Sequence, residues 1–218
     1  MQIATKSMRR WSAPEVSPAV AAAFADRWKR SRVASVVAHA SYLINVASRD
    51  GTYVFPMSVR ALADELRRAD ALGIPTVVLH AGSHGGAGLR EGMKRLVEGL
   101  CVALGEARGL RAGVALENMA GEGTTIGFRL EQLAQVLGEV GDPRLGCCID
   151  ICHLFAAGYD LRTERGYEGV MREVEATVGL ERVRVVHLSD SAGALGSRVD
   201  RHAERPSRLV TSTRVARV

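Results

Sequence analysis

Leu145-Gly-Cys-Cys-Ile149 is a short apolar run, and the carboxylate of Asp150 follows it directly. Runs of this kind are typical of strands that are buried on both faces, as in a parallel sheet. Four similar runs and a fainter one near the first residue complete the set: residues 2–5, 34–40, 76–80, 113–116 and 183–188. The sequence therefore predicts six strands.

Between these runs, apolar residues recur at the i, i+3, i+4, i+7 spacing of amphipathic helices. Such stripes occupy residues 59–66, 93–100, 126–137 and 167–178. Ser17 followed by Pro18 predicts an N-cap and first turn, opening a further helix that runs to about Lys29. The alternation of strands and helices predicts an α/β fold with a parallel sheet.

One polar residue, a potential metal ligand, closes each of five successive strands. These residues are His39, His80, Glu117, Asp150 and His187. A (β/α)8 barrel builds its active site in this way, whereas a doubly wound sheet gathers its site at one switch point. We therefore predict a TIM barrel. The average spacing is 37 residues, so eight units would need about 296 residues, and the 218 present predict an incomplete barrel of about six strands with exposed edges.

The composition excludes several classes of protein. Hydrophobic residues make up 47% and charged residues 24%, as in soluble globular chains. No apolar run approaches the ~18 residues of a membrane helix, and the first residues lack the layout of a signal peptide. The adjacent pair Cys147 and Cys148 is poor disulfide spacing, which predicts reduced thiols and a cytoplasmic protein. The net charge of +5 permits an anionic partner.

Histidine and acid pairs reinforce the expectation of a metal site. Asp150 and His153 are three residues apart, about one helical turn, while Asp200 and His202 are two apart and would point the same way in an extended segment. For either pair alone, a polar surface explains the pattern equally well. Imidazole with carboxylate suits zinc, manganese or iron. Cys147, Cys148 and Cys152 lack C-x2-C spacing, so we interpret these three as small buried hydrophobes.

The segment Lys6-Ser-Met-Arg9-Arg10-Trp11 combines positive charge with an aromatic ring. That mixture suits phosphate contact together with stacking on a base. A solvated loop with one packed tryptophan is the alternative.

Six segments follow one another along the chain: His39-Ala-Ser-Tyr-Leu-Ile-Asn45, His80-Ala-Gly-Ser-His84, Leu116-Glu117-Asn-Met-Ala-Gly-Glu-Gly-Thr124, Cys148-Ile-Asp150-Ile-Cys-His153 with its continuation to Thr163, His187-Leu-Ser-Asp190-Ser191 and Ser197-Arg-Val-Asp200-Arg-His202. In sequence and in order, these segments resemble endonuclease IV, the family of zinc-dependent apurinic/apyrimidinic endonucleases built on a TIM barrel.

The resemblance implies a site of up to three zinc ions, with manganese as an alternative metal. By this resemblance, His39 and His80 hold one ion, Glu117 bridges it to a second bound by Asp150 and His187, and His153, Asp200 and His202 hold the third. Glu117, Asp150 and His187 would be catalytic, and Arg9 and Tyr42 would contact DNA. The implied reaction is hydrolysis of the phosphodiester 5′ to an abasic site in double-stranded DNA by a monomeric enzyme, with the damaged nucleotide flipped out of the stack.

The resemblance also shows departures. It covers a barrel domain over residues 1–202, without the family's first strand and without a last strand whose glutamate completes the zinc pair, and residues 203–218 form a divergent basic tail. We therefore expect the nicking of abasic DNA by this chain to be very low or undetectable. Two other interpretations stay open: a metal-dependent sugar isomerase or epimerase, and a non-catalytic remnant that binds DNA or metal weakly. The cluster of Asp150 and His153 with Asp200 and His202, together with the basic Arg9–Arg10 loop, favours DNA.

Overall fold

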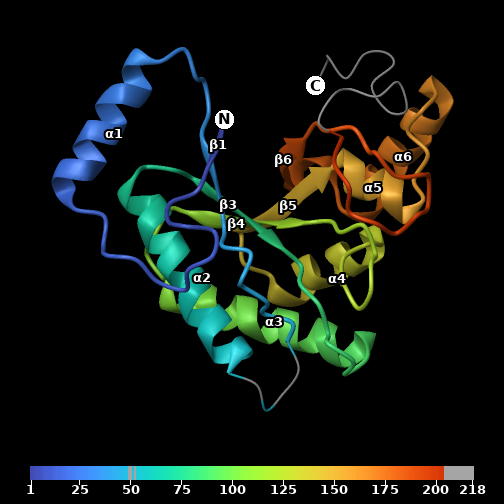
Figure 1. Ribbon diagram of the computed structural model, residues 1–218, viewed down its shortest axis with the longest axis horizontal. Coiled ribbons are helices and arrows are strands. Elements are labelled where there is room, and N and C mark those ends of the chain that lie inside the picture. Colours follow the sequence, from blue (N-terminus) through green and yellow to red (C-terminus); the bar gives the residue numbers. More distant parts are fainter. Residues whose placement is uncertain (49–50, 52, 204–218) are drawn as a thin grey trace.

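Six strands pair in the order in which they occur along the chain, every neighbouring pair parallel (Figure 1). The computed structural model describes residues 1–48, 51 and 53–203. The strands are β1 (Gln2–Ile3), β2 (Val37–His39), β3 (Thr76–His80), β4 (Gly113–Glu117), β5 (Leu145–Asp150) and β6 (Val183–His187). The sheet curls into part of a barrel, which confirms the prediction of an incomplete TIM barrel with six strands. The tail predicted for residues 203–218 lies, apart from Ala203, outside the described residues.

The helices that connect the strands are α1 (Pro18–Arg30), α2 (Val54–Ala71), α3 (Leu89–Glu106), α4 (Leu130–Val140), α5 (Ile151–Ala157) and α6 (Glu164–Thr177), with a 3-10 turn η1 (Leu180–Arg182). Of these, α2, α3, α4 and α6 pack side by side on the convex side of the sheet (Figure 1). The Ser17 side chain accepts a hydrogen bond from the Val20 N–H, as its predicted role as an N-cap requires. Among the described helices, none has the length and apolar character needed to cross a bilayer.

The helix predicted to start near Ile126 begins four residues later, at Leu130. Ile126 lies in the preceding loop, where its N–H donates to the Gly82 carbonyl and its side chain is fully buried. Ile126 therefore fits the apolar spacing of the helix because it packs on the same core, although it belongs to the loop that precedes α4.

Burial follows the position of each strand in the sheet. The central strands β4 and β5 are buried throughout, as predicted. The prediction that residues 183–188 are buried on both faces is wrong, since Val186 is 47% exposed and Leu188 63% exposed. The physical reason is that β6 is an edge of the described sheet and pairs only with β5.

The loop after β1 is fastened to α2 by buried charges. Lys6 Nζ lies 2.6 Å from Asp64 Oδ2 and 3.4 Å from Glu65 Oε1, and the side chains of Lys6 and Glu65 are each 1% exposed. Glu65 Oε1 also accepts from the N–H of Ser41, and the Ser41 hydroxyl donates to the Met8 carbonyl. This network holds the basic loop against the segment that follows β2.

Replacing Lys6 with Met should lower the free energy of unfolding by about 3 kcal/mol, because it leaves Glu65 buried without its counter-charge. Arg30→Ala breaks the exposed Asp26–Arg30 pair on α1 and should cost less than about 0.5 kcal/mol. Urea denaturation measures the free energy of unfolding of both variants. Equal costs for the two variants would show that the buried pair does not stabilise the chain.

Candidate metal centre

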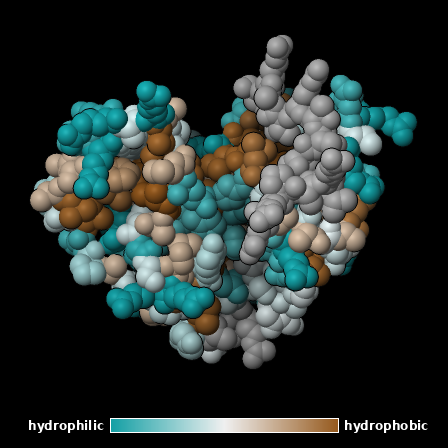
Figure 2. Space-filling view, turned by 45° about the horizontal axis from the view of Figure 1, so that its top comes forward, coloured by the Kyte–Doolittle hydropathy of each residue, from teal (hydrophilic) through white to brown (hydrophobic). Residues whose placement is uncertain are grey.

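The parallel register brings the predicted ligands together. His39, His80, Glu117, Asp150 and His187 are the last residues of strands β2 to β6, and the sheet pairs His80 with Glu117 and Asp150 with His187. A pocket of about 560 Å³ opens at this end of the sheet. Its lining comprises Gln2, His39, Tyr42, His80, Glu117, Met119, Glu122, Asp150, His153, His187, Asp200 and His202. Hydrophilic residues gather in the hollow of the face seen in Figure 2.

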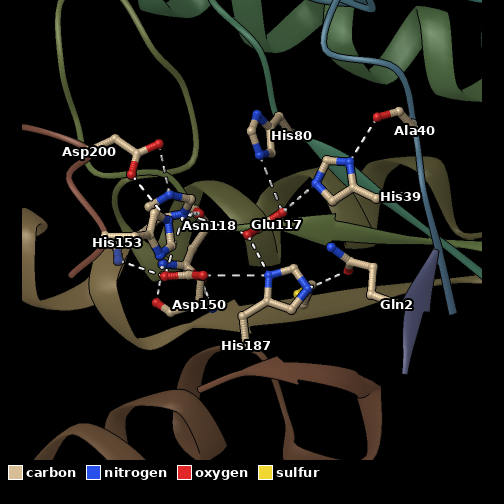
Figure 3. Close-up of polar contacts among 12 residues, drawn as sticks. Gln2, His39, Ala40, His80, Glu117, Asn118, Asp150, His153, His187 and Asp200 are labelled. Atoms are coloured by element: carbon tan, nitrogen blue, oxygen red, sulfur yellow. Dashed lines mark hydrogen bonds and ion pairs between the residues drawn. The ribbon is translucent and has the colours of Figure 1, made fainter. Parts of the chain in front are cut away.

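Glu117 lies at the centre of this pocket and is only 2% exposed (Figure 3). Its Oε2 is 3.4 Å from His39 Nε2 and 3.5 Å from His80 Nε2, while its Oε1 is 2.9 Å from His187 Nδ1 and 3.6 Å from His153 Nδ1. Burial alone would raise the pKa of Glu117, but the neighbouring imidazoles of His187 and His39 hold it well below its usual range. One carboxylate, ionised at neutral pH, therefore faces four imidazoles.

A second acid–imidazole group begins at the start of α5. Asp150 is the N-cap of this helix and accepts from the backbone N–H of His153. His153 Nε2 lies 3.2 Å from Asp200 Oδ2, and His202 Nε2 lies 3.2 Å from Asp200 Oδ1. The structure thus brings together all eight residues that the resemblance implies as ligands.

Two residues that no sequence pattern singled out orient these ligands. Asn118 exchanges hydrogen bonds with the Asp150 backbone, and its carbonyl accepts from His153 Nδ1 at 2.8 Å. Gln2 Oε1 lies 2.8 Å from His187 Nε2 (Figure 3). Their sequence signal is weak: Asn118 merely follows Glu117, and Gln2 is a polar residue in a faint apolar run. Such partners of the second ring nitrogen fix the orientation of ligating histidines in metal sites.

The histidines differ in their proton affinity. Burial lowers the pKa of His80 to about 4, against the opposing charge of Glu117. Burial would also lower the pKa of His153, but the Asp200 carboxylate beside it and the charges of Asp150 and Glu117 raise it to about 9. Such divergent environments in one pocket are typical of functional sites.

The donor set fits divalent metal ions. Four sets of side chains place their ligand atoms within 4.8 Å of one another: His39 with His80 and Glu117, Glu117 with Cys148 and His187, Asp150 with His153 and His202, and Cys152 with Asp200 and His202. Glu117 Oε2 and His153 Nε2 are buried and have no hydrogen-bond partner among the described residues. A buried polar atom without a partner is costly, and a coordinated cation would satisfy both atoms.

The two residues expected to contact DNA occupy different places. Tyr42 stands at the rim, 64% exposed, with its ring centroid 5.3 Å from that of His39 and 5.7 Å from that of His80. Arg9 is exposed on the loop after β1 and does not line the pocket. Its role stays a prediction.

A curved parallel α/β sheet with histidine and carboxylate side chains at its carboxyl edge defines a class of TIM barrel. A family model described as "Xylose isomerase-like TIM barrel" matches residues 1–206. Relatives named "Probable endonuclease 4" are 44% identical in Chloroflexus aurantiacus and 42% identical in Methanoculleus marisnigri, covering 93% and 92% of this chain and 71% of each relative. The crystal structure of endonuclease IV from Thermus thermophilus superposes with a TM-score of 0.81 at 42% identity, covering 93% of this chain and 70% of that one.

The chain belongs to the endonuclease IV family of xylose isomerase-like TIM barrels, which confirms the resemblance drawn from the six segments. A D-tagatose 3-epimerase-like protein superposes with a TM-score of 0.66 at 23% identity, covering 82% of this chain and 64% of that one. At that identity the likeness shows the shared fold alone.

The stability of the metal-free chain should fall as pH rises from 6.5 to 9. His153 has a pKa of 6.5 ordinarily and about 9 in the folded chain, so its contribution is fully present below pH 6.5 and is lost as pH rises through 9. Urea denaturation in a chelating buffer at these two pH values measures the change. Asp200→Asn removes the partner that raises this pKa and should shrink the fall. A free energy of unfolding that stays constant or rises between pH 6.5 and 9 would contradict the raised pKa of His153.

Proposed function

We propose that this chain is a DNA repair endonuclease that hydrolyses the phosphodiester 5′ to abasic sites, using up to three zinc ions. The observation that carries the proposal is the buried Glu117 carboxylate, which faces the His39 and His80 imidazoles with one oxygen and the His187 imidazole with the other. Membership of the endonuclease IV family supports a nuclease that acts on DNA.

The proposed ligand sets follow the groups in the pocket. His39 and His80 would hold one ion, and Glu117 would bridge it to a second held with Asp150 and His187. His153, Asp200 and His202 would hold the third. Nitrogen and carboxylate donors suit zinc, with manganese as the alternative.

Zinc, when bound, would supply Lewis-acid stabilisation of phosphate charge and activation of water at neutral pH. The residues of the chain have their own tasks in this proposal. The carboxylates of Glu117 and Asp150 would offset part of the charge of the cations. The hydrogen bonds to Asn118 and Gln2 would keep the ring nitrogens of His153 and His187 aimed into the pocket. Tyr42 would offer its exposed ring to the nucleotides flanking the lesion.

The other elements of the proposal concern the whole molecule. We propose a monomer with one barrel domain over residues 1–202 that acts on double-stranded DNA in the cytoplasm. A sugar isomerase or epimerase is the weaker alternative, since only the fold is shared with an epimerase-like protein. The second acid–imidazole group, in which Asp200 contacts both His153 and His202, favours the nuclease because a third cation would offset the added charge of a phosphodiester.

Replacing His153 with Ala should remove about one zinc per chain and lower nicking of an abasic duplex by about 10²-fold or more, because the phosphate would lose part of its positioning. Elemental analysis gives the zinc content, and a gel assay on abasic and intact duplexes gives the activity. His84 lines no part of the pocket, so His84→Ala should keep the full zinc content.

A wild-type chain that binds no zinc under replete conditions would refute the trinuclear site. Zinc binding without nicking of abasic DNA would instead support the interpretation as a non-catalytic remnant.

Binding to DNA should weaken as salt rises, with a slope of about −0.9 per phosphate neutralised. Arg9→Ala should lower the affinity and reduce the slope by about one such step. The matched control is Arg172→Ala, an exposed arginine of α6 that lines no part of the pocket. Fluorescence anisotropy over a series of salt concentrations measures both slopes. An unchanged slope for Arg9→Ala would identify the segment as a solvated loop.

A further inference from the structure

A buried acid on α2, Glu65, joins the loops that follow β1 and β2 and is not among the proposed metal ligands. Its side chain is 1% exposed, and it lines no part of the pocket. Its Oε1 accepts a hydrogen bond from the Ser41 N–H at 3.2 Å, and its Oε2 accepts one from the Thr5 hydroxyl at 2.5 Å. Thr5 lies in the loop after β1 and Ser41 in the loop after β2. One carboxylate therefore bonds to both loops, with one oxygen for each.

The two loops also bond to each other beside the residues expected to contact DNA. Met8, the residue before Arg9, accepts at its carbonyl from the Ser41 hydroxyl at 2.8 Å and from the Tyr42 N–H at 3.2 Å. The side chains of Arg9 and Tyr42 are both exposed. Hydrogen bonds thus fix the spacing of the two backbones, while the side chains that they carry stay open to solvent.

Two cationic side chains complete the attachment of the loop after β1. Lys6 Nζ lies 3.4 Å from Glu65 Oε1, and Arg68, one turn further along α2, donates to the carbonyls of Thr5 and Pro14. Arg68 is only 8% exposed. Buried charges and polar groups are costly unless each finds a partner, so the network favours one placement of the loop. The buried network therefore holds two exposed side chains in one arrangement.

We propose that Glu65 is a positioning residue for DNA binding, whose carboxylate sets the spacing of Tyr42 and Arg9 so that one duplex meets both side chains. The inference rests on the proposed function, in which Tyr42 and Arg9 contact DNA, and deepens it. Loops that are ordered before binding avoid the entropy cost of immobilising side chains and backbone at the interface. Loss of this order should weaken binding of an abasic duplex by about tenfold, as expected for a few side chains that must be immobilised on binding.

The experiment is a double-mutant cycle on the zinc-loaded chain. Fluorescence anisotropy measures the affinity for a duplex with one abasic site in the wild type, Glu65→Gln, Tyr42→Ala and the double variant. Zinc content, circular dichroism and nicking are measured on the same samples. Glu65→Gln should bind about tenfold more weakly with its zinc content unchanged. Tyr42→Ala should lower the affinity by a factor at least about threefold smaller when Glu65 is already replaced, whereas independent substitutions multiply to within about twofold.

A second acid supplies the matched control. Asp142 holds Arg144 by hydrogen bonds just before β5, at the end of the sheet away from the pocket. Asp142→Asn removes a structural carboxylate without touching either loop and should keep the affinity for DNA. Ser41→Ala removes the hydroxyl that donates to Met8 and leaves the Glu65 carboxylate in place. It gives the same cycle with Tyr42→Ala if Glu65→Gln does not fold.

Trp11 provides a measurement of the loop that needs no DNA. It belongs to the loop after β1, is partly buried against the core, and is the remaining tryptophan in a Trp28→Phe background. Acrylamide quenching of its fluorescence should increase in Glu65→Gln and stay unchanged in Asp142→Asn. Equal quenching with and without Glu65→Gln would overturn the claim that this carboxylate fixes the loop.

The remaining outcomes separate this proposal from the proposed function. An unchanged affinity in Glu65→Gln would overturn the positioning role, and so would an effect of Tyr42→Ala that is equal in both backgrounds, because the loss would then reflect general destabilisation. Binding by Tyr42→Ala that equals the wild type would also overturn it, since there would be no contact to position. In each of these cases, zinc uptake and nicking by the wild type would leave the proposed function intact. A wild-type chain that binds no abasic DNA would overturn both proposals.

Discussion

The interaction on which the site depends is that of one buried carboxylate with four imidazoles. Glu117, at the end of a fully buried strand, meets histidines from β2, β3, β6 and α5. Removing a carboxylate from water costs several kcal/mol unless charges and hydrogen bonds replace the solvent. The surrounding histidines supply these contacts in part, and the oxygen left without a hydrogen-bond partner among the described residues is where a cation would supply the rest.

The parallel sheet accounts for this convergence of ligands. Each of the strands β2 to β6 carries a small or apolar side chain into an interior layer and, two residues later, a proposed ligand on the same side, so the proposed ligands share one level of the barrel. Because neighbouring strands pair in parallel, ligands that are 33 to 41 residues apart in sequence meet without any special loop. The covering helices bury the opposite face, where the main core lies.

Supports around the ligands come from separate parts of the chain. Asp150 acts both as the N-cap of α5 and as a pocket residue, which ties the position of His153 to the end of β5. Gln2, from the opposite edge of the sheet, reaches His187 and links β1 to β6 across the concave side. The Lys6–Glu65 pair holds the basic loop in place beside the pocket.

The strand order, the incomplete barrel and the histidine and carboxylate side chains at the strand ends could all be predicted from the sequence, because each depends on local periodicity and on the residue that closes each run. The three-dimensional structure was needed to establish that helix α4 starts at Leu130, that β6 is exposed at its edge, and that Gln2 lies beside His187. Those features depend on which side chains meet across the fold. Gln2 and His187 are 185 residues apart, and no local pattern records such a pair.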